Sequence, residues 1–172
     1  AVGRLASRHD DPDAPPVRLL VVGDGPDRAR LARLADGLPA TFTGAVPPDD
    51  VRRWLLAADV SCLPRLDLPV TRLVPPLKPV EAMALGRPVV ASDLPPLAEL
   101  VRHGDTGLLV RPGDPEALAA ALRTLAVDAD MRHRLGRAAA QHVATTHTWS
   151  AVAATYTDLY ARLIHQREET PA

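Results

Sequence analysis

The architecture of the chain can be predicted from one stretch, VRLLVVGDGPDRARLARLADGLPATFTG, residues 17–44. Residues 17–25 form a continuous apolar run that ends in glycine, which is typical of a strand buried on both faces. Residues 26–38 repeat leucine and alanine at helical spacing, after a proline that suits a first helical turn. Residues 40–44 form a second short strand, so the stretch predicts two parallel strands joined by a helix.

The rest of the chain repeats this alternation. Apolar runs predict three more strands, at residues 60–64, 87–93 and 106–114, and helical patterns occupy 47–59, 77–86, 94–104, 114–126, 129–147 and 148–166. Asp114 is expected to cap its helix, and Asp49 or Asp50 to lie in the first turn of another, where carboxylates meet free N–H groups. Residues 65–76 are broken by prolines and are predicted to form a loop. The predicted fold class is α/β, a doubly wound parallel sheet with helices on both faces.

The length of 172 residues is enough for one domain with a proper core. We expect a Rossmann-like domain over residues 17–165, followed by a polar tail over residues 166–172. Residues 1–16 read as the end of a helix and a proline-rich linker, and we expect them to follow a further part of a longer protein.

The composition excludes several classes of function. A net charge of -1 and an aromatic content of 3% argue against nucleic-acid binding. Cys62 is the only cysteine, which excludes an internal disulfide and suits a reducing compartment, so a cytoplasmic location is expected. The histidines show no metal-ligand spacing, and we expect neither a metal nor a resident cofactor. No apolar run is long enough to span a membrane, and association with a membrane surface stays open.

The segment VPPLKPVEAMALGRPVVASD, residues 74–93, contains the only lysine of the chain. A loop leads into a helix at Leu77 and Lys78, so free N–H groups and the ammonium form an anion pocket suited to a diphosphate. Glu81, one turn later, can accept hydrogen bonds from the hydroxyls of a ribose. The flanking residues are apolar, which predicts a largely buried helix whose charged residues face a cleft. The alternative is an i, i+3 ion pair on a solvated helix face.

Other candidates follow from the rule that doubly wound sheets bind ligands at the carboxyl ends of their strands. The segment GDGPDR, residues 23–28, resembles the start of a dinucleotide fingerprint but carries Arg28 at its sixth position. It predicts either a plain tight turn or a backbone N–H near Gly25 that faces the ligand. Arg65, in the predicted loop, is a candidate for a contact to phosphate.

Several segments, in this order, resemble the carboxyl-terminal lobe of retaining glycosyltransferases of the two-Rossmann-domain (GT-B) type, glycosyltransferase family 4 or group 1. The resemblance covers about residues 17–165. It is carried by LLVVGDGPDRARLARLA, FTGAVPPDDVRRWLLAADVSCLP, PLKPVEAMALGRPVVASD and AELVRHGDTGLLVRPGDPEALAAAL, with HTW before the last helix.

The resemblance implies that this chain binds a nucleoside-diphosphate sugar, with UDP or GDP as the nucleotide. The family holds the diphosphate on backbone amides that match Leu77 and Lys78, and the ribose on a glutamate that matches Glu81, which makes Lys78 and Glu81 the candidate catalytic residues. Ala45 and Val46 match the loop against which the base lies. The acceptor lobe would precede this chain, and the fragment alone is expected to be inactive.

Two departures from the family pattern keep alternatives open. The family has two glutamates eight positions apart, and Leu73 stands where the first would lie. Arg72, beside it, is a candidate for a contact to phosphate or to the donor sugar, and the alternative is a solvated loop arginine. Pro95 and Pro96 replace a glycine pair that is common after the strand at residues 87–93. The alternatives are an NAD-binding oxidoreductase domain and a nucleotide-sugar-binding lobe that performs no transfer.

Overall fold

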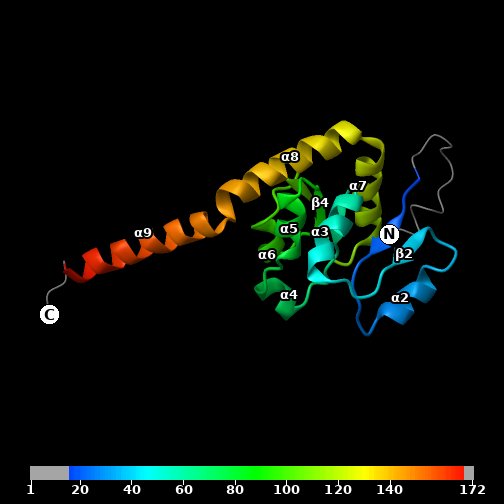
Figure 1. Cartoon of the computed structure of the whole chain (residues 1–172), viewed down its shortest axis with the longest axis horizontal. Helices are drawn as coiled ribbons and strands as arrows, with labels where there is room; N and C mark the ends of the chain where they lie inside the picture. The colour runs from blue at the N-terminus through cyan, green and yellow to red at the C-terminus, as the bar shows by residue number, and fades with distance from the viewer. Residues whose placement is uncertain (1–15, 169–172) are drawn as a thin grey trace.

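The computed structural model describes residues 16–168, and the side chains of residues 16–165. Within residues 16–168, five short strands form two sheets, and neighbouring strands in each sheet pair in parallel (Figure 1). In the first sheet, β1 (Leu19–Val21) pairs with β2 (Ala40–Phe42). In the second, β4 (Val89–Ser92) lies between β3 (Ser61–Leu63) and β5 (Gly107–Val110). The predicted fold class is confirmed, with strands shorter than the apolar runs that predicted them.

The sheet is divided where the sequence predicted continuity. Among the described residues, β1 pairs only with β2 and β3 pairs only with β4, so the two sheets share no ladder. The structure differs from the prediction because β1 and β3 each have one edge with no strand paired to it among the described residues. An apolar strand predicts that neighbours exist on its two sides, but it does not say which segment supplies them.

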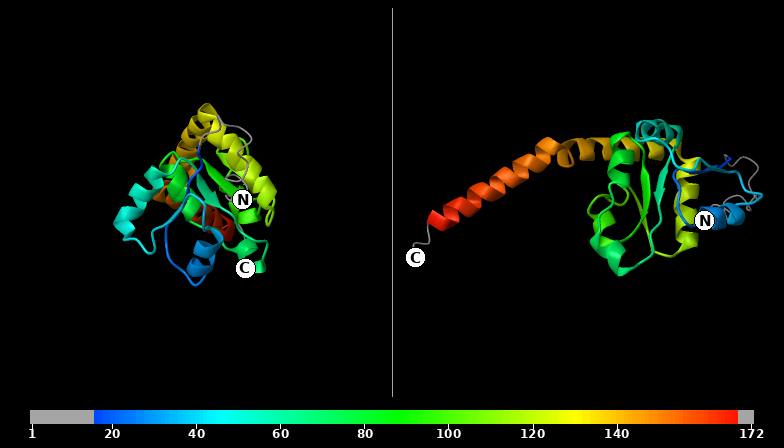
Figure 2. Two further views of the ribbon diagram at one scale, coloured as in Figure 1. Left: turned by 90° about the vertical axis from the view of Figure 1, so that its right-hand side faces the viewer. Right: turned by 60° about the horizontal axis from the view of Figure 1, so that its bottom comes forward.

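Eight helices are described between residues 16 and 168, and Figure 2 shows that the last of them extends away from the body. Their bounds are α2 (Arg28–Leu34), α3 (Pro48–Ala57), α4 (Pro69–Leu73), α5 (Lys78–Ala84), α6 (Pro95–Ala98), α7 (Pro115–Val127), α8 (Ala129–Thr146) and α9 (Trp149–Glu168). α9 continues beyond its predicted end at residue 166. The predictions for residues 1–15 and 169–172 lie outside the described residues.

Two local predictions were wrong. The predicted loop at 65–76 contains α4, which Pro69 opens at its first position and the Thr71 hydroxyl supports by accepting from the Leu68 N–H at 2.9 Å. The helix predicted over 94–104 ends at Ala98, because the chain then turns inward and buries Leu100 and Val101.

The hydrophobic core surrounds β4, whose four residues are all buried. One face of β4 contacts apolar residues of α5, α6 and the carboxyl-terminal part of α8, and the other contacts α7, β5 and the amino-terminal part of α8. Helices therefore cover both faces of this sheet, as predicted. The buried apolar residues are Ala82, Met83, Val89, Val90, Ala91, Leu94, Leu97, Leu100, Val101, Leu108, Ala119, Leu125, Leu135, Ala139 and Val143.

The predicted helix starts are also confirmed. Asp114 accepts hydrogen bonds from the N–H groups of Glu116 and Ala117 at 3.0 and 2.9 Å, as a capping aspartate does. Asp49 and Asp50 lie in the first turn of α3, where no side chain caps the helix.

Candidate functional site

α5 carries Lys78 and Glu81, for which the sequence predicted a diphosphate pocket. It follows the loop after β3, so it begins at the edge of the sheet formed by the carboxyl ends of the strands. Pro79, Ala82 and Met83 are buried, whereas Lys78 and Glu81 are exposed. The prediction of a largely buried helix is therefore half right, because α5 buries one side against the core and presents both charged residues on the other.

Lys78 and Glu81 form no ion pair with each other, and neither side chain has a hydrogen-bond partner among residues 16–168. The alternative of an i, i+3 ion pair is thus not what the structure contains. Leu77 precedes the helix with φ -80° and ψ -23°, and no side chain caps this end. Within the same residues, the amides of Leu77 and Lys78 have no backbone acceptor. Both charged groups and both amides are available to a ligand.

The loop before α5 is held at both ends by Arg65. The Ser92 hydroxyl, 2% exposed at the end of β4, accepts from the Arg65 N–H at 2.7 Å and donates to the Arg65 carbonyl at 2.8 Å. The Arg65 guanidinium donates from Nη1 to the Val74 carbonyl at 3.0 Å. Arg65, a candidate phosphate ligand, therefore makes structural contacts that hold the loop leading into α5. The sequence feature that could have indicated this contact is Ser92, a hydroxyl residue at the end of an apolar strand.

Arg72 is already engaged by a carboxylate that the sequence analysis did not single out. Its Nη2 and Nε donate to Asp67 Oδ2 and Oδ1, at 2.6 Å for the first of these bonds. The hydrogen bond and the charge of Arg72 lower the pKa of Asp67, and the same hydrogen bond raises the pKa of Arg72. A planar guanidinium is well suited to such a two-point pair. A phosphate would therefore have to share the Arg72 guanidinium with Asp67 or displace Asp67 from it.

Gly25, Ala45 and Val46 lie at the carboxyl edge of the other sheet. The Gly25 N–H donates to Asp24 Oδ1 at 2.8 Å, so the amide that the fingerprint suggested is occupied by its neighbour. The Gly23 N–H donates to the Gly44 carbonyl at 3.0 Å, which ties the ends of β1 and β2 together. Ala45 is exposed and Val46 is half-buried. No hydrogen bond or ion pair within residues 16–168 joins this group to Lys78 or Glu81.

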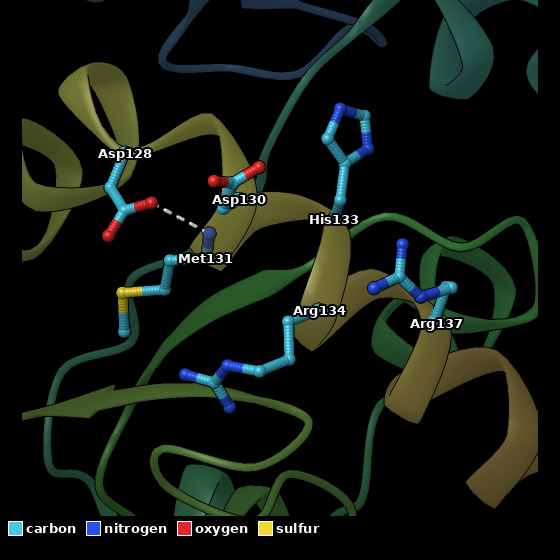
Figure 3. Close-up of a pocket in the computed structure, with 6 residues that line it drawn as sticks. All are labelled: Asp128, Asp130, Met131, His133, Arg134 and Arg137. Carbon is cyan, nitrogen blue, oxygen red and sulfur yellow. Dashed lines mark hydrogen bonds between the residues drawn. The ribbon is translucent and has the colours of Figure 1, made fainter.

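A cavity of about 500 Å³ lies beside the start of α8, just after α7 (Figure 3). Asp128 accepts from the Met131 N–H at 2.7 Å and caps α8, and Arg134 donates to the Gly104 carbonyl at 3.1 Å. These contacts are structural, and the cavity lies away from the predicted site. Its lining residues are Asp128, Asp130, Met131, His133, Arg134 and Arg137.

Two further features of the described residues concern other kinds of site. No group of three or more His, Cys, Asp or Glu side chains in residues 16–168 is placed to hold a metal ion. In the same part of the chain, no helix combines the length and the apolar character that crossing a membrane requires.

Comparisons with known proteins identify similar chains. The family model described as "Glycosyl transferases group 1" matches residues 1–128. The D-inositol 3-phosphate glycosyltransferase of Corynebacterium urealyticum is 34% identical over 182 residues, an alignment that covers 100% of this chain and 41% of that protein. The chain therefore spans less than half of this relative's length.

Two solved structures resemble the fold. Sucrose-phosphate synthase from Thermosynechococcus elongatus gives a TM-score of 0.68 at 29% identity, covering 87% of this chain and 39% of that one. The Anabaena protein Alr3699/HepE, solved in complex with UDP, gives a TM-score of 0.62 at 26% identity, covering 89% of this chain and 42% of that one. The same Anabaena protein has also been solved with UDP-glucose.

Proposed function

The chain belongs to the glycosyl transferases group 1 family, with a Rossmann-like lobe of the GT-B fold, and on that premise we propose that it is a donor-binding lobe. The donor is a nucleoside-diphosphate sugar, and the full-length protein transfers its sugar to an acceptor with retention of anomeric configuration. The observation that supports this most strongly is the likeness to Alr3699/HepE, a protein solved with UDP and with UDP-glucose.

Lys78 is the residue we assign to the leaving group. When the anomeric C–O bond breaks, negative charge builds up on the departing diphosphate, and a fixed positive charge beside it lowers the barrier. Lys78 is exposed and has no hydrogen-bond or ion-pair partner among residues 16–168, so no internal contact has to be broken before it binds phosphate. The amides of Leu77 and Lys78 would add two backbone donors to the same oxygens.

Glu81 is assigned to the ribose. It lies on the exposed side of α5 with Lys78, at the i, i+3 spacing that places two side chains on one face of a helix. An ionised carboxylate only accepts hydrogen bonds, and a ribose offers two hydroxyl donors next to each other. Holding the ribose fixes the position of the diphosphate and therefore of the anomeric carbon.

The remaining candidates have secondary roles in this proposal. Ala45 and Val46 would offer backbone contacts to the base. Arg65 would approach phosphate through the guanidinium nitrogens that Val74 leaves free, and Arg72 would do so only by sharing Asp67. Gly25 contributes the shape of its turn, because its N–H already donates to Asp24.

The acceptor is assigned to a separate lobe. The Corynebacterium urealyticum relative and sucrose-phosphate synthase are each more than twice as long as this chain, which leaves room for a second domain in a full-length protein. We therefore expect nucleotide binding from this chain alone, and transfer only when the acceptor lobe is present. No step in the proposal requires a metal or a resident cofactor.

Calorimetric titration of the chain with UDP, GDP and ADP tests the proposal. One of these nucleotides should bind, and Lys78→Ala and Glu81→Gln should each weaken its affinity by about 5- to 150-fold, the range for one charged hydrogen bond. Lys78→Arg should weaken it as well if the pocket is too narrow for a planar guanidinium. Arg137→Ala is the matched control, because it removes one exposed positive charge beside the cavity at α8.

The outcomes separate this proposal from the alternatives. Affinity that falls with Arg137→Ala but not with Lys78→Ala would move the nucleotide site to the α8 cavity. Binding of NADH without binding of any nucleoside diphosphate would favour an oxidoreductase domain, against which the family match already argues. Nucleotide binding in a full-length protein that transfers no sugar would leave a binding lobe without catalysis.

A further inference from the structure

Two side chains of opposite charge approach Gly44, just after the carboxyl end of β2. Gly44 is buried, and its φ of 71° is one that residues with a side chain rarely adopt. A Cβ at this position would lie 3.9 Å from Nη2 of Arg28 and 4.0 Å from Oδ2 of Asp24. A carboxylate from the turn after β1 and a guanidinium from the first position of α2 therefore converge on one point at the edge of the sheet.

The fold leaves both charges available to a ligand. The Gly25 N–H donates to Asp24 Oδ1 at 2.8 Å, which holds the carboxylate in place, and Oδ2 has no donor among the described residues. In the same part of the chain, the exposed Arg28 side chain has no hydrogen-bond partner and forms no ion pair with Asp24. The neighbouring Asp27 and Arg30 differ, because their side chains bond each other at 3.0 Å.

The two groups lie next to the loop that the proposed function assigns to the nucleotide base. Ala45 and Val46 follow Gly44 directly. The Gly23 N–H donates to the Gly44 carbonyl at 3.0 Å, so the turn that carries Asp24 is tied to this loop. Contacts from the backbone of Ala45 and Val46 would hold any base, whereas a fixed carboxylate and a planar guanidinium can distinguish one base from another.

The bases differ in how their donors and acceptors are arranged. Guanine has two neighbouring donors, N1–H and the 2-amino group, and two neighbouring acceptors, O6 and N7. Uracil has a single N3–H between two carbonyl oxygens, which repel a carboxylate, and adenine has one amino group between two acceptor nitrogens. A carboxylate beside a guanidinium complements guanine, because the first accepts from the donor pair and the second donates to the acceptor pair.

We propose that Asp24 and Arg28 select guanine as the base of the donor, so that the donor is a GDP-sugar. This inference rests on the proposed function, since it concerns the base of the same nucleotide. The Asp24 carboxylate accepts from N1–H and the 2-amino group, and the Arg28 guanidinium donates to O6 and N7. Lys78 and Glu81 are assigned to the diphosphate and the ribose, which all nucleoside diphosphates share, so their contribution does not depend on the base.

Calorimetric titration of the chain with GDP, UDP, ADP and inosine diphosphate tests the choice of base. GDP should bind at least about tenfold more tightly than UDP or ADP, because a charged hydrogen bond is worth at least that factor. Inosine diphosphate lacks only the 2-amino group of GDP and should bind about fivefold or more weakly than GDP, since one bond to the carboxylate is lost. These titrations use the parent chain, so no variant has to fold.

Two conservative variants test the two side chains separately. Asp24→Asn keeps an oxygen for the Gly25 N–H but removes the charge. It should weaken GDP binding at least about tenfold, leave UDP binding nearly unchanged and reduce the difference between GDP and inosine diphosphate. Arg28→Lys should also weaken GDP binding, because an ammonium cannot donate along two parallel bonds. The matched controls are Asp36→Asn and Arg33→Lys, at exposed positions after and within α2, and they should leave every affinity unchanged.

The outcomes separate this choice of base from the proposed function. If Lys78→Ala weakens GDP and UDP by the same factor and Asp24→Asn weakens GDP alone, both proposals are supported. If UDP or ADP binds as tightly as GDP, or if the parent and Asp24→Asn bind GDP equally, the selection of guanine is overturned and the proposed function remains. If none of the four nucleotides binds, both proposals are overturned.

Discussion

The β1–α2–β2 unit (residues 19–42) and the β3–α8 unit (residues 61–146) share the alternation of apolar strands and helices but differ in burial. Every apolar side chain that is buried among the described residues belongs to the second unit. β4 is paired on both sides and covered on both faces, whereas β1 is paired on one side and α2 buries no residue. An apolar sequence gives a strand the capacity to be buried, and its neighbours determine whether that capacity is used.

The largest expected difference in stability between the two units comes from a leucine-to-alanine substitution made in each. Leu125, in α7, is 0% exposed, and Leu34, in α2, is 67% exposed. Leu125→Ala should lower the free energy of unfolding by about 2–5 kcal/mol, because it leaves a cavity in the core. Leu34→Ala should change it by no more than about 0.5 kcal/mol.

Urea denaturation followed by circular dichroism measures both variants, with the slope of the transition checked against the parent chain. Equal losses would contradict the comparison, since they would mean that α2 is packed in solution.

Gly136 provides the second contrast, because a glycine-to-alanine change in a helix usually stabilises it by about 1 kcal/mol. A Cβ at Gly136 in α8 would lie 2.1 Å from the Gly86 carbonyl oxygen, a backbone atom at the end of α5. Gly136→Ala should therefore destabilise the chain, by about 1–3 kcal/mol, as overpacking does. The β1–α2–β2 unit provides the control, since a Cβ at Gly25 meets nothing within 4 Å.

Thermal unfolding of the Gly136→Ala and Gly25→Ala proteins distinguishes these expectations. A Gly136→Ala protein as stable as the parent would mean that α8 can move away from α5 at little cost. That result would remove the close contact between these helices as the reason why α5 holds its position at the candidate site.

The sequence was sufficient for the fold class and for most element positions, since both depend on local patterns. The five strands, the cap at Asp114 and the two closing helices are where apolar periodicity and helix-start residues placed them. The division of the sheet could not be predicted, because strand order depends on partners far apart in sequence. α4 was missed because its helix depends on the side chain of Thr71 and not on an apolar period.

The places of the candidate residues in the fold were predictable from the sequence, but their contacts were not. The exposure of Lys78 and Glu81 on one side of α5 follows from their spacing. The partners of the arginines do not, since Asp67 and Val74 reach Arg72 and Arg65 only after the loop has folded. Residue type identifies which groups can bind a phosphate, and the folded loop determines which of them are already engaged.

Helix capping gives a smaller contrast between the two parts of the chain. Asp114 caps α7 with two hydrogen bonds, whereas α3, next to the β1–α2–β2 unit, has no side-chain cap. Asp114→Ala should cost about 1 kcal/mol, and Asp114→Asn much less, because asparagine can still accept from the same N–H groups. Asp49→Ala in α3 should cost only a few tenths of a kcal/mol, the size of an exposed dipole interaction. Losses of equal size at both sites, in urea denaturation, would contradict the difference in capping.

The smallest expected change in stability concerns His142, near the junction of α8 and α9, where the β3–α8 unit ends. His142 is half-buried, its Nε2 has no hydrogen-bond partner among residues 16–168, and its ring meets the His147 ring edge-on at 5.6 Å. Burial lowers the pKa of His142, the charges of Arg102 and His147 lower it further, and Asp105 acts in the opposite direction. The folded state therefore disfavours protonation of this ring.

The sign of the pH dependence follows from that direction. The unfolded chain binds a proton at His142 more readily than the folded chain does. The contribution of His142 to stability is therefore present above its pKa in the unfolded state and is lost as pH falls through its pKa in the folded state. The unfolding midpoint should drop between about pH 7.5 and about pH 5.5, the range in which histidine titrates, and His142→Gln should reduce that drop. The exposed His133, on the same helix, is the control, and its replacement by glutamine should leave the drop in place. Identical pH profiles for the parent and His142→Gln would mean that solvent reaches the ring, and that burial in the β3–α8 unit stops short of this joint.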